Sequence, residues 1–99
     1  MKRGDVWVYT SPSRTPRVLV VSSEFLNEAR LPVVVDVTEI EPSVTTLGLL
    51  GVRLGDGVGY ARCSGLGTAD PARFGTRIAE VPEDVMDQVD AALRVALDL

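Results

Sequence analysis

The sequence predicts a small α+β domain in which a curled antiparallel sheet or barrel is followed by one helix. Three observations support this: short apolar runs alternate with turn residues up to residue 81, an amphipathic stripe occupies the last segment, and 99 residues suffice for one core. We therefore expect a single domain over residues 1–99. A chain of this size buries only about 60–65% of its unfolded surface, so association with a second chain is a reasonable expectation.

Five to seven short strands are expected. The stretches with strand composition are residues 5–10, 17–22, 31–38, 44–46, 49–54, 58–63 and 75–81. In the first stretch two valines alternate with Trp7 and Tyr9, which is typical of a half-buried strand. Trp7 is expected to pack in a core or dimer interface rather than to stack on a base. The second stretch is a continuous apolar run, which fits burial on both faces.

Glycine and proline mark the connections. Residues 24–29 fit one helical turn, although the pattern is too short to settle it. Gly65 and Gly67 are interpreted as a strand-to-turn pair, because the lysine and further glycine of a phosphate loop do not follow them. Asp70 and Pro71 have the pattern of an N-cap and a first helical residue, so they predict a single turn.

The last segment is the clearest helix. Pro82 occupies the expected first helical position, and Glu83 and Asp84 place negative charge at the positive end of the helix dipole. One apolar stripe at helical spacing runs through Val85, Val89, Ala92, Leu93, Ala96 and Leu97. The charged residues that fall away from this stripe are Asp84, Asp87, Asp90, Arg94 and Asp98.

The net charge of −4 argues against a generic nucleic-acid binder, for which a basic domain is expected. The charge is unevenly distributed, however. Residues 82–99 contain five acidic side chains and one basic one, which accounts for the whole excess. Residues 1–30 contain five basic side chains against three acidic ones. A local positive surface is therefore compatible with the acidic total.

Cysteine usage and the N-terminal segment predict a soluble cytoplasmic protein. Cys63 is the only cysteine, which excludes an intrachain disulfide, and no basic partner is evident that would make it a nucleophile. We expect it to be a small buried hydrophobic residue. The opening residues lack the apolar region of a signal peptide, and no apolar run approaches the roughly 20 residues that span a bilayer.

The absence of histidine restricts the chemistry. Zinc sites lack their usual ligands, and Ser–His or Cys–His nucleophilic machinery is impossible within one chain. The carboxylates of Asp36, Glu39 and Glu41 are interpreted as solvated groups at a strand edge rather than as ligands of a divalent ion. No metal and no cofactor are expected.

Arginine and hydroxyl groups are the remaining candidates for a site directed at phosphate. An arginine is a permanent cation whose planar fork matches two phosphate oxygens, and a threonine hydroxyl at a strand end can donate to a third. Arg14, Arg17 and Thr38 are the candidates. From these residues alone, solvated loop arginines and an ordinary strand threonine are the more common interpretation.

Four stretches in this order carry a family resemblance. They are "KRGDVWV", "RVLVVSSEFLN", "LPVVVDVT" and the tail from "GVGYARCSGLGTADPARFGTRIAEV" into the helix. Together they cover nearly the whole chain, which resembles the MazF/PemK toxins. The resemblance implies an SH3-like barrel with a C-terminal helix, a homodimer and a cognate antitoxin protein. It also implies metal-independent, sequence-selective cleavage of single-stranded mRNA that leaves 2′,3′-cyclic phosphate and 5′-OH ends.

The family's functional positions carry over only in part. Thr38 matches the family's strand-end hydroxyl, whereas the catalytic arginine of the family immediately precedes a proline that here comes first, as Pro16-Arg17. A shift of one residue turns a strand side chain to the opposite face, so Arg17 reaches the site only if Pro16 imposes a bulge. Otherwise Arg14 supplies the guanidinium.

The loop before the second strand takes part in RNA and antitoxin contacts in the family, and here it is short. The resemblance places RNA-binding roles on Ser13, Thr15, Tyr9 and Thr68. Gly67 stands where many relatives carry an arginine before that threonine. Whether Tyr9 and Tyr60 contact bases or an antitoxin strand is left open. The acidic face of the helix is expected to lie away from RNA, because phosphate is repelled there.

Two other functions compete with an active endoribonuclease. One is a catalytically degenerate toxin that acts by binding a protein partner, which the exchanged Pro16-Arg17 pair and the acidic total favour. The CcdB type of that function is disfavoured, because it depends on a tryptophan near the C-terminus and Trp7 is the only tryptophan here. The other is a plain SH3-like interaction module, for which no aromatic peptide groove is evident.

Overall fold

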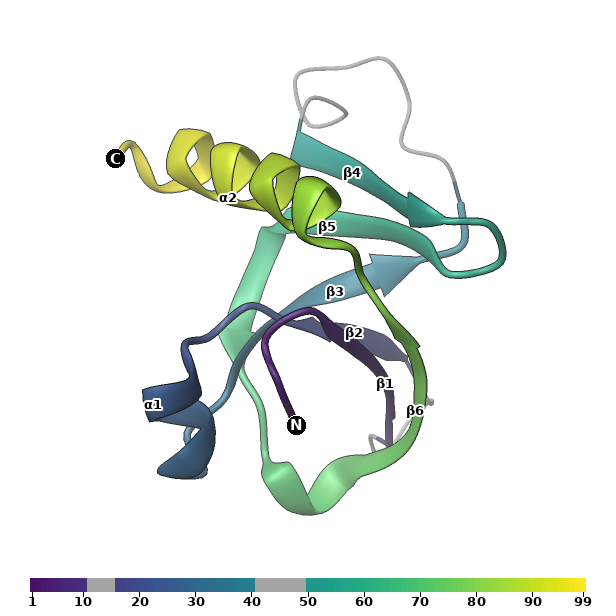
Figure 1. The fold of residues 1–99 in the computed structure, drawn as a ribbon, viewed down its shortest axis with the longest axis vertical. Coiled ribbons are helices and arrows are strands. Elements are labelled where there is room, and N and C mark those ends of the chain that lie inside the picture. Colours follow the sequence, from purple (N-terminus) through teal and green to yellow (C-terminus); the bar gives the residue numbers. More distant parts are fainter. Residues whose placement is uncertain (11–15, 41–49) are drawn as a thin grey trace.

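The computed structural model describes residues 1–10, 16–40 and 50–99 and shows an α+β arrangement of strands and helices (Figure 1). The strands are β1 (Asp5–Tyr9), β2 (Arg17–Val20), β3 (Val33–Thr38), β4 (Gly51–Gly55), β5 (Gly59–Thr68) and β6 (Phe74–Glu80). The helices are α1 (Glu24–Glu28), the short 3-10 helix η2 (Pro71–Arg73) and α2 (Glu83–Leu97). The expected strand at 44–46 lies outside the described residues.

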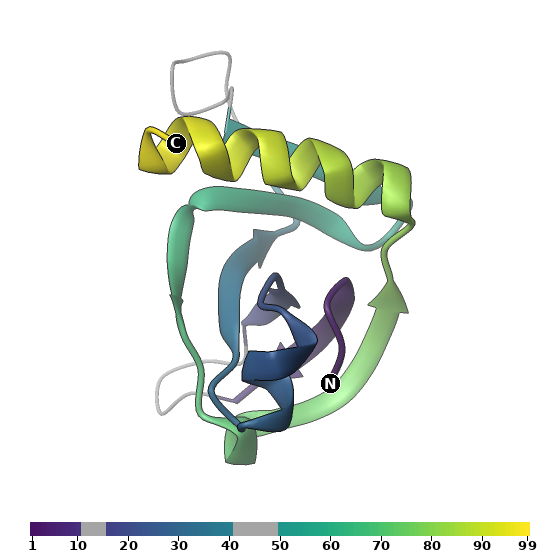
Figure 2. The same ribbon diagram turned by 60° about the vertical axis from the view of Figure 1, so that its left-hand side comes forward.

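The strands form one curled antiparallel sheet in the order β4-β5-β3-β2-β1-β6. The expectation of a closed barrel is wrong, because the two edge strands β4 and β6 do not pair within the described residues. Helix α2 follows β6 and lies across β4 and β5, so helix packing rather than a further strand pairing closes this side of the core (Figure 2).

Strand alternation divides the buried side chains between the two faces of the sheet. The inner face and α2 enclose the main core, which includes Val6, Leu19, Val35, Val37, Cys63 and Val89. The outer face of β1, β2 and β3 carries a second cluster, in which Val18, Val20 and Val34 pack with Trp7, Tyr9 and Phe74. The rings of Trp7 and Phe74 are stacked with their centroids 5.6 Å apart. The expected packing role of Trp7 is confirmed.

Cys63 is confirmed as a buried residue of the main core. It is 1% exposed, and this burial raises the pKa of its thiol to about 11. Because a thiol with such a pKa remains protonated at neutral pH, Cys63 acts as a small hydrophobic residue there.

Strand β5 is longer than its sequence indicates. Gly65 and Gly67 lie inside the strand, so their interpretation as a strand-to-turn pair is wrong. The pairing of β3 with β5 shifts between Val35 and Asp36, which is a bulge in β5. A Cβ atom at Gly65 would lie 2.8 Å from Oδ2 of Asp36, whereas one at Gly67 would meet nothing within 4 Å. A side chain at Gly65 would displace the Asp36 carboxylate, whereas one at Gly67 would displace nothing.

The expected turn at residues 24–29 is the helix α1. Ser23 caps it by accepting a hydrogen bond from the amide of Leu26. The buried Ser22 hydroxyl donates to Oδ1 of Asn27 at 2.5 Å and accepts from the amide of Val33 at 3.0 Å. These bonds fasten α1 to the start of β3. Asp70 caps η2 as expected, through a 3.0 Å bond from the amide of Ala72.

Helix α2 differs in detail from its prediction. Pro82 is the N-cap rather than the first helical residue, because its carbonyl accepts the first hydrogen bonds of the helix. Met86 is buried although it lies outside the predicted stripe, whereas Ala96 and Leu97 are exposed beyond the covered part of the sheet. Nη2 of Arg3 lies 2.5 Å from Oδ1 of Asp90, so Asp90 is ion-paired rather than freely solvated. Within the three described ranges, no helix has the length and apolar character needed to span a bilayer.

Candidate functional site

The polar residues of the candidate site lie on the outer face, where β3 and β5 pair. Thr38 lies opposite Tyr60, and Asp36 lies opposite Arg62. The intervening pair, Val37 and Ala61, is buried in the main core. Because side chains alternate along both strands, Thr38, Tyr60, Asp36 and Arg62 all project from the side opposite the core.

A pocket of about 470 Å³ surrounds Thr38 and is called the Thr38 pocket here. The residues that line it include Pro16, Arg17, Asp36, Thr38, Glu39 and Arg62. Oγ1 of Thr38 accepts a 3.2 Å hydrogen bond from the amide of Ile40. A hydroxyl that accepts one bond keeps its proton available for donation, so Thr38 can donate to an oxygen placed in the pocket. The arrangement combines a donor, cations and carboxylates.

Arg17 is held by the protein itself. Its Nη1 donates to the carbonyls of Gly57 and Val58, each at 3.2 Å, and its Nη2 lies 2.9 Å from Oε1 of Glu39. The side chain is 28% exposed. We call this set of contacts the Arg17 clasp, because it connects β2 with the end of β3 and with the turn between β4 and β5.

The orientation of Arg17 follows from its register. Arg17 pairs with Val37, whose side chain is in the main core, and the pairing of β2 with β3 runs without a shift from Arg17 to Val20. The bulge that would turn Arg17 toward the face of Thr38 is therefore absent from these paired residues. The exchange of proline and arginine therefore starts the Arg17 side chain from the inner face of β2, although the residue still lines the Thr38 pocket at the strand end.

Arg62 projects from the same face as Thr38, as Arg53 of β4 does. It is exposed, and within the described ranges its guanidinium has no hydrogen bond and no ion pair within 4.0 Å. The carboxylate of Asp36, directly across the strand pair, is turned toward Gly65. Reasoning from the sequence missed Arg62. The available signal was its position between Ala61 and Cys63, two small apolar residues of a strand, which indicates a side chain on the opposite face.

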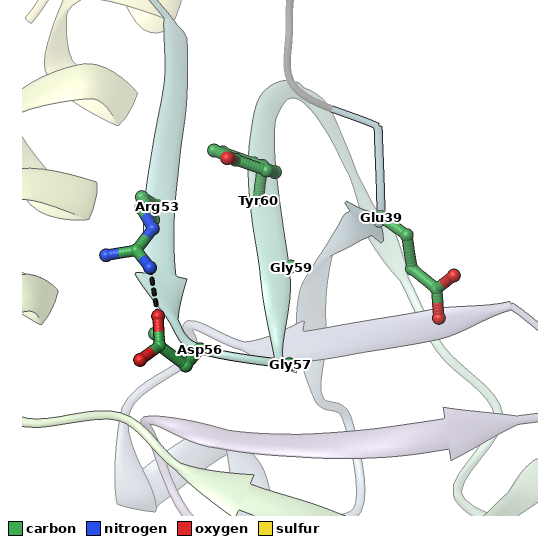
Figure 3. A pocket seen from close by; sticks show the side chains of 7 residues that line it. Glu39, Arg53, Asp56, Gly57, Gly59 and Tyr60 are labelled. Carbon is green, nitrogen blue, oxygen red and sulfur yellow. Dashed lines mark hydrogen bonds and ion pairs between the residues drawn. The ribbon is translucent and has the colours of Figure 1, made fainter.

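Two further hollows adjoin the Thr38 pocket. The first, of about 500 Å³, is lined by Tyr9 and Thr68 and shares Pro16 and Asp36 with the Thr38 pocket. The second, of about 470 Å³, is drawn in Figure 3; we call it the Tyr60 pocket, and Glu39 lines both it and the Thr38 pocket.

The predicted RNA-binding residues are brought together only in part. Tyr9 and Thr68 line one hollow, and the Tyr9 hydroxyl accepts a 3.0 Å hydrogen bond from the amide of Asp70. Ser13, Arg14 and Thr15 lie outside the described residues.

The sequence of the whole chain decides the family. Residues 2–97 match the model of the family described as PemK-like, MazF-like toxin of type II toxin-antitoxin system. The chain belongs to this family. It is also 32% identical to Endoribonuclease PemK of Escherichia coli, over 98% of this chain and 82% of that protein. The resemblance noted in the sequence is thereby confirmed.

Solved structures show the same MazF-like fold. An endoribonuclease in complex with its cognate antitoxin from a mycobacterial species superposes with a TM-score of 0.87 at 23% identity, covering 100% of this chain and 96% of that one. The MazE-MazF complex from Deinococcus radiodurans gives a TM-score of 0.82 at 19% identity, with the same coverages. At these identities the two comparisons establish the fold.

Proposed function

We propose that this MazF/PemK-family toxin is an endoribonuclease that cleaves single-stranded RNA without a metal ion. The observation that carries the proposal is the placement of Thr38 beside Arg62 in the middle of three adjoining hollows on the outer face. Such a row fits an extended, unpaired strand, whose splayed bases occupy separate hollows. The activity named for the Escherichia coli relative supports the same reaction class.

The reaction we propose is attack by a ribose 2′-hydroxyl on its adjacent phosphorus. The new O2′–P bond forms as the P–O5′ bond breaks, which leaves a 2′,3′-cyclic phosphate and a 5′-hydroxyl end. Asp36 is a carboxylate of the Thr38 pocket that can accept the proton of the 2′-hydroxyl. The leaving oxygen takes a proton from water. No redox step and no group beyond the chain are required.

Thr38 and an arginine stabilise the charge that develops on the phosphoryl oxygens. The Thr38 hydroxyl donates to one oxygen, and the fork of Arg62 spans two. We assign the guanidinium role to Arg62, because Arg17, which also lines the Thr38 pocket, is engaged by two carbonyls and Glu39 in the clasp. Arg17 then acts as a positioning residue that holds the end of β3. Arg14, which lies outside the described residues, remains the alternative source of the cation.

We also propose a cognate antitoxin and a second copy of the chain as partners. Relatives of this fold have been crystallised with their antitoxins. The last turn of α2 leaves Val95, Leu97 and Leu99 at least half exposed, which is the apolar surface that a second copy can cover. Helix α2 packs across β4 and β5 on the core side of the sheet (Figure 2), so we place its acidic residues away from the RNA track on the outer face.

The test is incubation of the purified toxin with a long unstructured RNA in excess EDTA, followed by mapping of the ends. We expect discrete cuts with 2′,3′-cyclic phosphate ends that disappear in Thr38→Ala and in Arg62→Ala. Arg94→Ala, at an exposed arginine near the end of α2, is the matched control and retains full cleavage. A folded toxin that cuts no RNA would instead support the competing function, a degenerate family member that acts by binding a protein.

A further inference from the structure

The Tyr60 pocket contains an aromatic ring that the proposed chemistry does not use. Tyr60 is the centre of a row across three strands, because it pairs with Thr38 on β3 and with Arg53 on β4. The side chain is half-buried and lines the pocket of about 470 Å³. Its position one strand away from Thr38 puts the ring next to the phosphate that Thr38 would bind.

Three glycines contribute only backbone to the lining of the pocket. They are Gly55, Gly57 and Gly59, and a Cβ atom at Gly57 would meet nothing within 4 Å. Gly59 has φ +115°, and a Cβ atom there would lie 2.6 Å from the carbonyl oxygen of Thr38, so this glycine is required by the close approach of β3. The open space at Gly57 leaves this part of the pocket accessible to a flat group.

The polar groups of the pocket flank Tyr60 on both sides (Figure 3). Arg53 and Asp56 form an ion pair on the β4 side, and Glu39 lies on the β3 side, paired with Arg17. Each carboxylate is thus bonded to an arginine through one oxygen, Oδ1 of Asp56 and Oε1 of Glu39, which lowers its repulsion of an RNA phosphate. The second oxygen of each carboxylate remains able to accept a hydrogen bond.

From these contacts we infer that the Tyr60 pocket is a nucleobase subsite that selects a base with an exocyclic amino group. This inference rests on the proposed cleavage of RNA and names the part of the site that reads the base next to the cut. The base stacks on Tyr60, since every base has a π-face that an aromatic ring can hold. Its amino group donates to a carboxylate oxygen, and Arg53 donates to a ring nitrogen or carbonyl. Uracil is disfavoured, because its single edge donor, N3–H, lies between two carbonyl oxygens that a carboxylate repels.

The first experiment separates stacking from hydrogen bonding. Tyr60→Ala should raise KM for RNA cleavage about tenfold, because loss of base stacking costs that much in other single-strand binders. Its kcat should change by less than KM does. Tyr60→Phe, which keeps the ring, should stay within about twofold of the unmodified toxin. An unchanged KM in Tyr60→Ala, or an equal rise in both variants, would overturn the stacking role.

The second experiment reads the base preference by sequencing the ends produced from an RNA with randomised positions. The unmodified toxin should cut poorly where uracil occupies the position next to the cut, and Asp56→Asn should accept uracil there, because an amide also donates hydrogen bonds. Glu28→Gln, an exposed acidic residue of α1, is the control and should leave the preference unchanged. Equal cutting at all four bases by the unmodified toxin would overturn the selection.

Failure of the proposed cleavage is distinguishable from failure of this subsite. If the toxin cuts no RNA, its binding to A, C, G and U hexamers is measured by fluorescence anisotropy. Weaker binding of the U hexamer, together with a loss in Tyr60→Ala, would support the subsite without the nuclease. Binding of none of the four hexamers would overturn both proposals. A Tyr60→Ala variant that weakens only the antitoxin complex would show that the pocket is a protein contact and overturn the subsite.

Discussion

Two arginines line the Thr38 pocket, and they are in opposite states. Arg17 starts from the inner face of β2 and is held by two carbonyls and Glu39. Arg62, on the outer side, is exposed beside Thr38. Strand β3 lies between the strands that carry them. The comparison shows that the face of a strand, set by a single residue of register, decides whether an arginine is engaged by backbone carbonyls or stands exposed.

The largest expected effect separates these two arginines by activity. Arg62→Ala and Thr38→Ala should each lower kcat for RNA cleavage by about 100-fold or more, because each removes a donor to the developing charge. Arg17→Ala should lower it by less. Arg62→Lys should recover only part of the loss, since an ammonium cannot span two oxygens. Steady-state cleavage at equal folded fractions checks this. Full activity in Arg62→Ala with complete loss in Arg14→Ala would move the catalytic role to the loop.

For the free energy of unfolding, we expect the opposite order, with a larger effect from Arg17→Ala than from Arg62→Ala. Arg17→Ala leaves two carbonyls and Glu39 without their donor, and we expect it to lower the free energy of unfolding by about 1–3 kcal/mol. Arg62→Ala should change it by less than about 0.5 kcal/mol, as for other exposed side chains. Urea unfolding followed by circular dichroism measures both. An equal loss in the two variants would mean that the clasp does not stabilise the strand ends.

Cys63 extends the comparison to the inner face of β5, one residue from Arg62. Burial raises its pKa to about 11, so above pH 9 the unfolded chain loses the thiol proton and the folded chain keeps it. The folded state then binds more protons than the unfolded state, and stability falls as the pH rises. Between pH 9 and pH 11 the toxin should lose up to about 2 kcal/mol relative to its own value at pH 8. In Cys63→Ala this part of the pH dependence should be missing from the unfolding curves.

The glycines of β5 provide a matched pair on the outer face. Gly65→Ala forces Asp36 to move, because the new Cβ atom would lie 2.8 Å from Oδ2. We expect a loss of about 1 kcal/mol in stability, together with weaker cleavage if Asp36 accepts the proton. Gly67→Ala has open space and should be neutral or stabilising by about 0.5 kcal/mol. Thermal unfolding and cleavage rates are measured for the two variants. Equal stability and equal cleavage would contradict the close contact between Gly65 and Asp36.

The smallest effect is expected on the acidic helix α2. Asp87→Lys should leave RNA cleavage within about twofold, because α2 packs on the core side of β4 and β5, whereas we place the RNA track on the outer face. Asp90→Lys is not an equivalent test, since it also breaks the ion pair with Arg3. Stronger RNA binding by Asp87→Lys, measured at low salt, would place the track closer to α2 than we propose.

Much of the fold was predictable from local patterns. Alternation in residues 5–10, the helical stripe after Pro82 and the N-cap at Asp70 each depend on side chains within a few residues of one another. The same patterns, in the same order, carried the family resemblance. The position of Thr38 at the end of a strand could also be predicted, because the apolar run that precedes it ends there.

The remainder depended on pairing between distant segments. Gly65 and Gly67 concealed the full length of β5, because two glycines in a sequence suggest a turn. The space beside Gly65 is taken by the carboxylate of Asp36, which lies on β3. Closure by α2 instead of by a strand pair was equally invisible, since it depends on how far β4 and β6 curl.

Local patterns along the chain were enough to predict the fold class, the family, the terminal helix and the shortage of chemical groups other than arginine, hydroxyl and carboxylate. Strand pairing was needed to find that Arg17 is held by Gly57, Val58 and Glu39 and that Arg62 and Tyr60 lie near Thr38. The physical reason is range: periodicity and capping act over a few residues, whereas the neighbours of a side chain on a sheet are set by which strands pair and in which register.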